Sequence, residues 1–490
     1  MRSGLKRRTL ENIGYNATSK IVALAFQAVA SIILSRNLSS ADYGVVGFAW
    51  IFINFLSQFN DLGLNNAVVH TRDLDDDGLA TVFTLKFLIS AALFVTAVSI
   101  APAARWIFDD AAVVTIIRVL SFSFVLNAFT FVPSALLTRA LDYRRLAVAS
   151  TLGTFATAAI SIVLVLLGFG YWSIVVANVA AGVVGVVVLN TLSPKRFVVR
   201  LDPARAREFI RYGWGLFASG LLIFAVFNTD NFIIGATRGS EQLGLYMIAF
   251  SWGSMVATLM VAGVHAVLFP TFARIQAERE RIRGAYLLSF KYITALGVMV
   301  NATLFVVAPD FLIHVLGRGT TKWLPALDAL RILCAYGVIR VMLEPLGNVI
   351  MAFGRTTLLM RATLVAAAIE VALLYPALRA FGIEGAAVVV TLAYLVQYGI
   401  YWKFLKSEVG VKLADLGRAI GPAMAPLLAL AAVFVVFARR ADDSTPAVFA
   451  VKLAACVVCY VVSYGLVTGW AVVADVRGLL GMSRSTSHDA

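Results

Sequence analysis

The chain has 490 residues, of which 60% are hydrophobic and only 14% are charged, and its formal net charge at neutral pH is +14. Soluble globular domains carry about 25% charged residues, so the composition excludes a soluble protein. The basic residues form no domain outside the apolar runs, which excludes nucleic-acid binding as the meaning of the positive charge. Charged stretches separate apolar runs of about 20 residues or more, each long enough to cross a bilayer.

These runs predict an all-α integral membrane protein with about fourteen transmembrane helices. The second expected span is short and ends at Asn60 and Asp61, and the tenth is the most highly charged. The expected spans cover residues 13–36, 43–61, 78–101, 112–138, 146–167, 171–192, 209–235, 243–270, 286–308, 325–352, 357–378, 383–404, 417–437 and 447–470.

The distribution of Lys and Arg predicts the orientation of the spans. Basic residues concentrate in alternate loops, and the longest of these polar stretches is 193–208. Because such loops remain in the cytoplasm, both termini are expected there. The loop 70–77 departs from this pattern, since it holds four aspartates and one arginine, but acidic residues contribute little to the rule.

The two hydrophobic halves of the chain resemble each other. Lysine precedes an aromatic residue at matching places within an apolar span of each half, and small residues recur at an offset of 200 positions. A repeat with an even number of spans keeps its orientation, so the halves are expected to be related by an axis along the membrane normal. The matched residues are Gly44 and Gly244, Ala49 and Ala249, Gly63 and Gly263, and Lys86 and Lys291.

This repeat predicts the domain organisation. We expect two pseudo-symmetric six-helix lobes, residues 1–192 and 209–405, joined by a cytoplasmic linker at 193–208. An additional helix pair at 417–470 stands outside the repeat, and a cytoplasmic tail at 471–490 ends the chain. The repeat alone favours a transporter, because transporter sites commonly lie between related halves of a bundle.

Basic residues inside apolar spans are the main candidates for substrate binding. Lys86 and Lys291 are expected nearer the cytoplasm, and Arg118 and Arg331 nearer the other face. A charge at this depth is costly and commonly functional, and positive groups suit an anionic substrate. The hypothesis is two tiers of positive charge, with Arg36 at the end of the first span as a further candidate. The alternative is that these side chains extend to the headgroups and fix helix depth.

Three carboxylates inside spans are candidates for ion coupling or gating. Asp230 is predicted either to take part in a proton or sodium relay, or to cap the turn at 236–239, or to pair with Arg238. Glu370 has no basic neighbour at helical spacing, so it is expected to be protonated or paired across helices. No cluster of residues predicts a catalytic, metal or cofactor site.

Glu344 is the third of these carboxylates. It stands four residues after Arg340, a spacing that favours an ion pair on one helix face. It also precedes Pro345, whose missing N–H can kink a helix and allow it to act as a hinge. Both interpretations remain open at this point.

Two pairs of segments resemble a known family. Residues 33–44 (ILSRNLSSADYG) with 59–65 (FNDLGLN), and residues 230–235 (DNFIIG) with 243–249 (LGLYMIA), are similar to the signatures of bacterial polysaccharide exporters. The resemblance covers roughly residues 10–405. The chain thus resembles Wzx-type oligosaccharide flippases of the multidrug/oligosaccharidyl-lipid/polysaccharide (MOP) superfamily, whose fold is similar to that of the MATE transporters.

The resemblance implies a fold, a cargo and partners. It implies two lobes rocking about a cationic central cavity, which would move a polyprenyl-pyrophosphate-linked oligosaccharide from the cytoplasmic to the periplasmic leaflet of a bacterial inner membrane. It also implies a polysaccharide polymerase and a chain-length regulator as partners. The energy source is open between proton coupling, sodium coupling and removal of the product.

Two other functions remain as alternatives. A MOP-type exporter of cationic drugs would require a cavity dominated by carboxylates. A membrane polymerase or glycosyltransferase would require a large extracytoplasmic loop that carries charged catalytic residues. The expected loops 102–111, 236–242 and 315–324 are short for such a loop.

Overall fold

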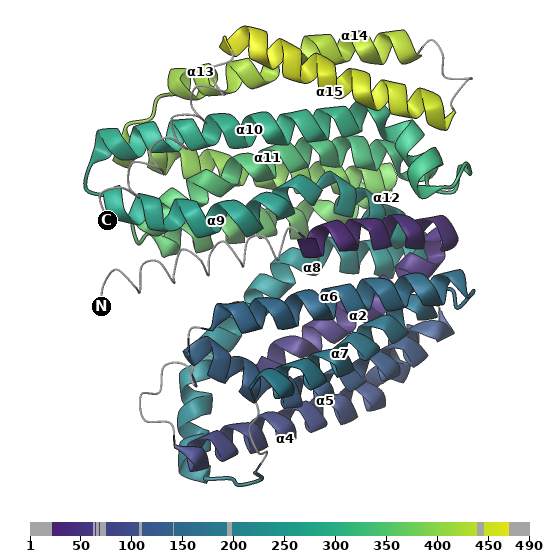
Figure 1. The fold of residues 1–490 in the computed structure, drawn as a ribbon, viewed down its shortest axis with the longest axis vertical. Coiled ribbons are helices and arrows are strands. Elements are labelled where there is room, and N and C mark those ends of the chain that lie inside the picture. The colour runs from purple at the N-terminus through teal and green to yellow at the C-terminus, as the bar shows by residue number, and fades with distance from the viewer. Residues whose placement is uncertain are drawn as a thin grey trace. The chain divides into compact units, whose positions relative to one another are not determined.

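The computed structural model of the chain describes residues 22–61, 64, 68, 75–106, 110–140, 142–193, 198–438 and 445–469. Every regular element within these ranges is a helix (Figure 1), which confirms the expected all-α class. Nine of the described helical segments are long and apolar enough to cross a membrane. The expected total of fourteen spans stays a prediction.

The helices follow the apolar runs of the sequence. An N-terminal helix, Val22–Asn37, precedes the labelled ones. The longer labelled helices are α2 (Ser40–Asp61), α4 (Asp76–Ile100), α5 (Ala111–Arg139), α6 (Tyr143–Leu166), α7 (Trp172–Leu192), α8 (Pro203–Gly253), α9 (Met255–Ile275), α10 (Arg279–Asp310), α11 (Leu327–Ala352), α12 (Thr356–Phe404), α13 (Leu413–Met424), α14 (Pro426–Ala438) and α15 (Pro446–Thr468). Short turns η1 (Ala101–Trp106), η2 (Phe311–Leu316), η3 (Leu324–Ala326) and η4 (Leu405–Val409) extend or join them.

Two long helices are interrupted at glycines where the sequence predicts loops. Gly239 in α8 has φ 82° and Gly382 in α12 has φ 65°. Only glycine adopts this left-handed region readily, so each glycine ends one helical segment and lets the next begin. The breaks fall between the expected seventh and eighth spans and between the eleventh and twelfth.

Contacts divide the chain into two compact units. The first contains residues 1–248 and 367–386, and the second contains 249–366 and 387–490. These boundaries cut through α8 and α12 rather than following the expected linker, so the division into lobes 1–192 and 209–405 stays a prediction.

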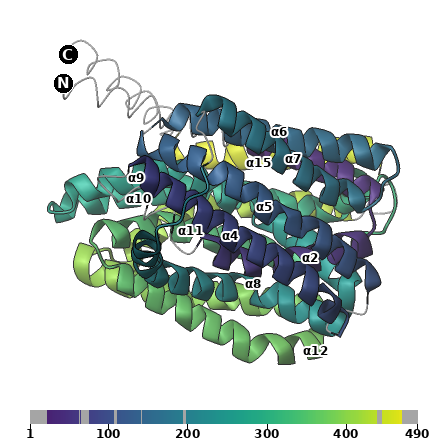
Figure 2. The same ribbon diagram turned by 90° about the horizontal axis from the view of Figure 1, so that it is seen from below.

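In the first unit, α5 packs against α2, α4 and α7, and α6 lies along α7 (Figures 1 and 2). Burial of apolar side chains holds one end together, in a cluster that includes Leu64, Phe83, Phe131 and Phe209. Such packing, together with the helical hydrogen bonds, is what stabilises a bundle in lipid.

In the second unit, α10 packs against α9, α11, α13 and α15. The Tyr460 hydroxyl of α15 lies 2.9 Å from the carbonyl oxygen of Ala295 and 3.1 Å from that of Ala423. Lys452 of α15 donates to Asp310 at the end of α10 over 2.8 Å, and both side chains are buried. The C-terminal helices are thus held within the second unit by buried polar contacts as well as by apolar packing.

The expected linker at 193–208 is partly helical. Helix α8 already begins at Pro203, where the Asp202 carboxylate accepts hydrogen bonds from the first turn; a cap followed by proline is a common helix start. The described residues just before it, 198–202, form no helix and lie against α4, since the backbone N–H of Arg200 donates to the Thr84 hydroxyl over 2.9 Å. The hydropathy pattern of the sequence predicted that this helix begins at residue 209. Hydropathy measures the length of an apolar run and does not detect helix caps.

The acidic loop before α4 meets this basic segment. Arg205 pairs with Asp75, and Arg200 pairs with Asp77. These ion pairs give Asp75 and Asp77 a structural role, which accounts for two of the acidic residues in a loop otherwise expected to be basic.

We expect the Asp75–Arg205 pair to be lost on acidification. The hydrogen bond from Arg205 lowers the pKa of the Asp75 carboxyl from 3.8 to about 2. A depressed pKa stabilises the folded state above the unfolded pKa, and the gain disappears as pH falls through the folded pKa. Thermal unfolding of Asp75→Asn should therefore occur below that of the wild type at pH 7, and the difference should shrink between about pH 4 and pH 2. Glu241→Gln, at an exposed carboxylate, is the control; an unchanged difference at low pH would contradict the assignment.

The matched glycines of the repeat meet in the first unit. A Cβ added at Gly44 would lie 1.7 Å from the carbonyl oxygen of Ser240, and one at Gly244 would lie 1.9 Å from that of Ser40. The first turns of α2 and of the α8 segment after Gly239 therefore cross backbone to backbone. The repeat inferred from the sequence thus corresponds to a reciprocal contact.

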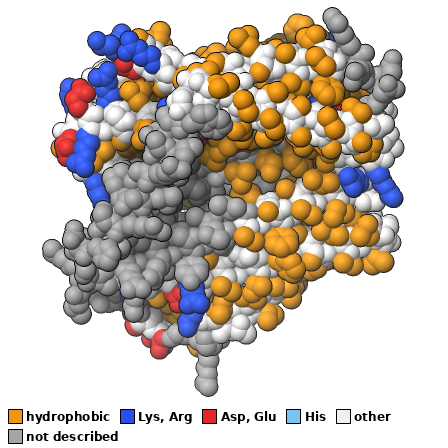
Figure 3. Space-filling view, turned by 45° about the horizontal axis from the view of Figure 1, so that its top comes forward, with side chains coloured by type: hydrophobic (Ala, Val, Ile, Leu, Met, Phe, Trp, Pro, Cys, Tyr) orange, Lys and Arg blue, Asp and Glu red, His pale blue; other side chains and the backbone are white. Residues whose placement is uncertain are grey.

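Hydrophobic side chains cover most of the described surface on the face drawn in Figure 3, and charged side chains gather at its margins. This distribution is what a surface surrounded by lipid requires.

Candidate functional site

Lys86 lies inside the first unit as part of a polar network. Its side chain is 2% exposed, and its ammonium group donates to the backbone carbonyl of Asn60 over 2.6 Å and lies 4.9 Å from the centroid of the Phe131 ring. The Asn60 side chain accepts from Ser90 over 2.8 Å and donates to Asn127 over 3.4 Å. The cation is thus stabilised by a backbone carbonyl and an aromatic face.

The other basic candidates lie in more open positions. Lys291 is half-buried, 5.1 Å from the centroid of the Tyr292 ring, and Arg118 and Arg36 are exposed. Arg331 is half-buried, lies 3.8 Å from Asp328, and contacts the rings of Phe305 and Phe434. Lys86, Arg118 and Arg36 belong to the first unit, and Lys291 and Arg331 to the second. The two tiers of charge stay a prediction.

The predicted pairing of Arg340 with Glu344 is confirmed. Their side chains form a hydrogen-bonded ion pair of 2.7 Å one turn apart on α11. The guanidinium group also lies 5.8 Å from the centroid of the Tyr394 ring. The Glu344 carboxylate therefore has a basic partner, and α11 continues through Pro345 as one helix.

Asp230 and Glu370 are both buried in the first unit. Asp230 is 5% exposed and accepts hydrogen bonds from the Tyr246 hydroxyl over 2.9 Å and from the Asn231 backbone over 2.7 Å. Glu370, also 5% exposed, is near enough to interact electrostatically with it.

One of the alternatives for Asp230, pairing with Arg238, can be compared with the structure. Arg238 donates to the carbonyl oxygens of Leu378 and Arg379 rather than to Asp230, so the predicted pairing of Asp230 with Arg238 is wrong. Backbone carbonyls near the Gly382 break attract this guanidinium because they lie at a helix end. Among the described residues, the hydrogen bonds to the Asp230 carboxylate come from the Tyr246 hydroxyl and from Asn231 rather than from a basic side chain.

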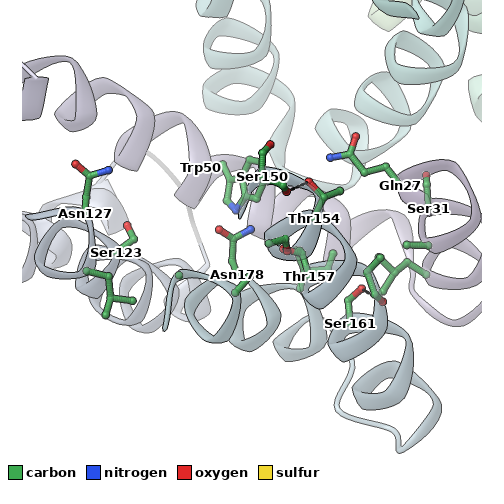
Figure 4. A pocket seen from close by; sticks show the side chains of 18 of the residues that line it. Gln27, Ser31, Trp50, Ser123, Asn127, Ser150, Thr154, Thr157, Ser161 and Asn178 are labelled. Atoms are coloured by element: carbon green, nitrogen blue, oxygen red, sulfur yellow. Dashed lines mark hydrogen bonds between the residues drawn. The ribbon is translucent and has the colours of Figure 1, made fainter. Parts of the chain in front are cut away.

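A polar cavity of about 650 Å³ opens in the first unit. Its lining comes from the N-terminal helix, α2, α5, α6 and α7, and Figure 4 shows Trp50, Ser150, Thr154, Thr157 and Asn178 gathered around one part of it. The sequence analysis missed this site, since it searched for charges. The available signal was Ser and Thr at helical spacing along an otherwise apolar run.

These features define a multi-pass helical membrane protein with buried polar sites and a cavity inside its bundle. Residues 33–328 match the family described as polysaccharide biosynthesis protein, and the chain belongs to that family. It is thus a membrane protein of polysaccharide biosynthesis, as the resemblance implied.

Relatives support the same assignment. The chain is 28% identical over 292 residues to the succinoglycan biosynthesis transport protein ExoT of Rhizobium meliloti, an alignment that covers 58% of each chain. It is 20% identical over 400 residues to the lipopolysaccharide biosynthesis protein WzxC of Escherichia coli, which covers 80% of this chain and 78% of WzxC. The chain thus spans somewhat more than half of ExoT and about three quarters of WzxC.

Solved structures share the fold. The lipid II flippase MurJ in an inward closed conformation superimposes with a TM-score of 0.73 at 12% identity, covering 94% of this chain and 100% of MurJ. An inward-facing multidrug resistance MATE family transporter of the MOP superfamily gives a TM-score of 0.64 at 18% identity, covering 79% and 94%. The expected MOP-type fold is confirmed.

Proposed function

We propose that the chain is a flippase that moves a polyprenyl-pyrophosphate-linked oligosaccharide from the cytoplasmic to the periplasmic leaflet of a bacterial inner membrane. Membership of the polysaccharide biosynthesis family carries this proposal. The relatives named as transport and lipopolysaccharide biosynthesis proteins, and a fold shared with a lipid flippase, support it. Transport would proceed by alternating access, with the prenyl tail remaining in lipid.

The anionic part of the cargo needs positive partners. Lys291, Arg118, Arg331 and Arg36 have partly exposed side chains, so they are the better candidates for pyrophosphate oxygens. Lys86 already donates to a backbone carbonyl and is deeply buried. Its proposed role in binding would require the Asn60 network to rearrange.

A cationic-drug exporter is the second candidate, and the likeness to MATE transporters favours it. Such cargo calls for carboxylates on the cavity wall. The described residues that line the polar cavity include none, and Asp230 and Glu370 are not among them. This chemistry favours the glycolipid flippase.

The proposal is tested in the bacterium that carries this chain. Deleting its gene should leave the lipid-linked oligosaccharide on the cytoplasmic leaflet, so that a membrane-impermeant lectin labels it in inverted vesicles but not in spheroplasts. Restoring the gene should return label to the spheroplasts. Equal labelling of spheroplasts with and without the gene would overturn the proposal.

We place ion coupling at Asp230 and Glu370. Both carboxylates are buried in an apolar setting and like charges repel each other, so these two groups are suited to hold a proton or a sodium ion. The Tyr246 hydroxyl would orient Asp230 during this exchange. Binding and release of the ion would then bias the transport cycle.

Asp230→Asn is expected to remove the dependence of transport on an ion gradient. Wild-type protein in liposomes should flip lipid faster under an imposed proton or sodium gradient. The variant should flip lipid at the rate measured without a gradient. Glu241→Gln, at an exposed carboxylate near the same break in α8, should retain the acceleration. If the gradient that accelerates the wild type also accelerates the variant, the coupling role is contradicted.

The cellular setting follows from the same proposal. Both termini would face the cytoplasm, as the loop charges predict, and the chain would work beside a polysaccharide polymerase and a chain-length regulator. Helices α13 to α15 are fastened into the second unit, so their outer faces would be the surface offered to such a partner.

A further inference from the structure

The polar cavity in the first unit lies at the middle of its helices. Ser123 and Asn127 are near the centre of α5, and Ser150 to Ser161 span the middle half of α6. Polar side chains at membrane depth are tolerated where they face protein or a water-filled cavity. Their concentration around one space of about 650 Å³, a volume within the usual range of roughly 300–1,000 Å³ for small-molecule sites, is typical of a binding site.

The wall on α6 is a row of hydroxyl groups. Ser150, Thr154, Thr157 and Ser161 follow one another at spacings of four, three and four residues, which places them on one helix face. The Thr154 and Thr157 hydroxyls donate to carbonyls one turn back, over 3.0 Å each. A hydroxyl that donates in this way retains lone pairs that accept hydrogen bonds. This wall therefore presents acceptors.

Amide side chains on other helices face the same space. Asn178 of α7, Gln27 of the N-terminal helix and Asn127 of α5 line it, and an amide offers both donors and an acceptor. Asn127 is held by Asn60, whose backbone carbonyl binds Lys86. The lining thus combines donors and acceptors from several helices, as a ligand rich in hydroxyl groups requires.

Charge is missing from this lining. The described residues that form it include no Asp, Glu, Lys, Arg or His. A second cavity of about 600 Å³ in the same unit is lined mainly by apolar residues such as Phe52, Phe55 and Phe232. A lining that combines neutral polar side chains with apolar ones therefore distinguishes the first cavity from the second, and it suits an uncharged polar ligand rather than a pyrophosphate or a lipid chain.

We propose that this cavity binds uncharged sugar residues of the cargo, while the pyrophosphate binds elsewhere. Sugar hydroxyls would exchange hydrogen bonds with the α6 hydroxyls and with the amides of Asn178 and Gln27. Trp50, which is 39% exposed and lines the cavity, offers an aromatic face for a sugar ring. The inference rests on the proposed function and names the part of the cargo that this unit recognises.

Binding to purified protein in detergent tests the proposal. The probes are a ten-carbon prenyl pyrophosphate, the same lipid bearing three neutral hexoses, and the trisaccharide lipid with a terminal glucuronate. Wild-type protein should bind the neutral glycolipid about tenfold more tightly than the sugar-free lipid, which corresponds to a few net hydrogen bonds. The glucuronate should reduce that gain, because no basic group in the lining receives its charge.

The variant Thr154→Val plus Thr157→Val removes two hydroxyls and keeps the side-chain shape. It should lose most of the sugar-dependent gain and bind the sugar-free lipid like the wild type. Thr138→Val plus Thr191→Val is the matched control, since these hydroxyls also donate to carbonyls one turn back but lie outside the lining. Asn178→Met provides a second lining variant and should also lose the gain.

The outcomes separate the inference from the function on which it rests. If the wild type binds the sugar-free and neutral lipids equally, or if both lining variants keep the full gain, the sugar site is overturned and the flippase stands. Equal weakening of both lipids in the variants would also overturn it, because the cavity would then serve structure. Failure of the wild type to bind any of the lipids would overturn the proposed function and this inference together.

Discussion

Gly44→Ala is expected to abolish lipid translocation. The new Cβ would lie 1.7 Å from the backbone oxygen of Ser240, and backbone atoms cannot move aside as a flexible side chain does. The first turns of α2 and of the α8 segment after Gly239 would separate, and the conformation in which they cross would be lost. Because a transport cycle needs every one of its conformations, we expect at least a tenfold loss of rate in liposomes.

Gly244→Ala should have the same effect, since its Cβ would meet the backbone oxygen of Ser40 from the other side. Gly47→Ala is the matched control on α2. There the added Cβ would meet the sulfur of Met247, a flexible end that can shift, so transport should stay close to normal. Normal transport by Gly44→Ala and Gly244→Ala, at equal reconstitution, would contradict a role for this contact in the cycle.

Lys452→Met is expected to have the largest effect on stability. The Lys452 ammonium donates to Asp310 over 2.8 Å, and each side chain is 10% exposed. Removing one partner leaves an uncompensated buried charge, which costs about 3–5 kcal/mol. Because the pair joins α15 to the end of α10, unfolding of the variant in a titration with dodecyl sulfate should begin at lower detergent fractions.

A second substitution distinguishes charge from packing. Lys452→Met plus Asp310→Asn leaves no unpaired charge and should recover most of the lost stability. Lys403→Met, at an exposed lysine of α12, should behave like the wild type. If the single and double variants unfold alike, the ion pair is not what fastens the C-terminal helices.

Much of the fold follows from apolar length alone. Bilayer thickness sets a minimum length for each helix, so the long runs in the sequence predicted α4 to α7 within a few residues. The breaks at Gly239 and Gly382 fall where short polar stretches interrupt the runs. The early start of α8 was missed because Asp202 and Pro203 act through capping, which hydropathy does not measure.

The site was only partly predictable. Arg340 and Glu344 were paired correctly because their partnership is local, one helical turn apart. Lys86 was correctly singled out as buried charge in an apolar run, but its partner is a backbone carbonyl 26 positions away, which no residue type signals. The polar cavity of the first unit combines neutral residues from five helices, and each of these residue types is common in membrane helices.

Translocation by the purified protein tests the central claim most directly. A fluorescent polyprenyl-pyrophosphate oligosaccharide is placed in both leaflets of liposomes, and a membrane-impermeant reductant quenches the outer leaflet. We predict that liposomes containing the protein lose nearly all fluorescence, because inner-leaflet lipid reaches the outside, whereas protein-free liposomes keep about half. Retention of the inner-leaflet half in the presence of active, correctly reconstituted protein would contradict the assignment as a lipid-linked oligosaccharide flippase.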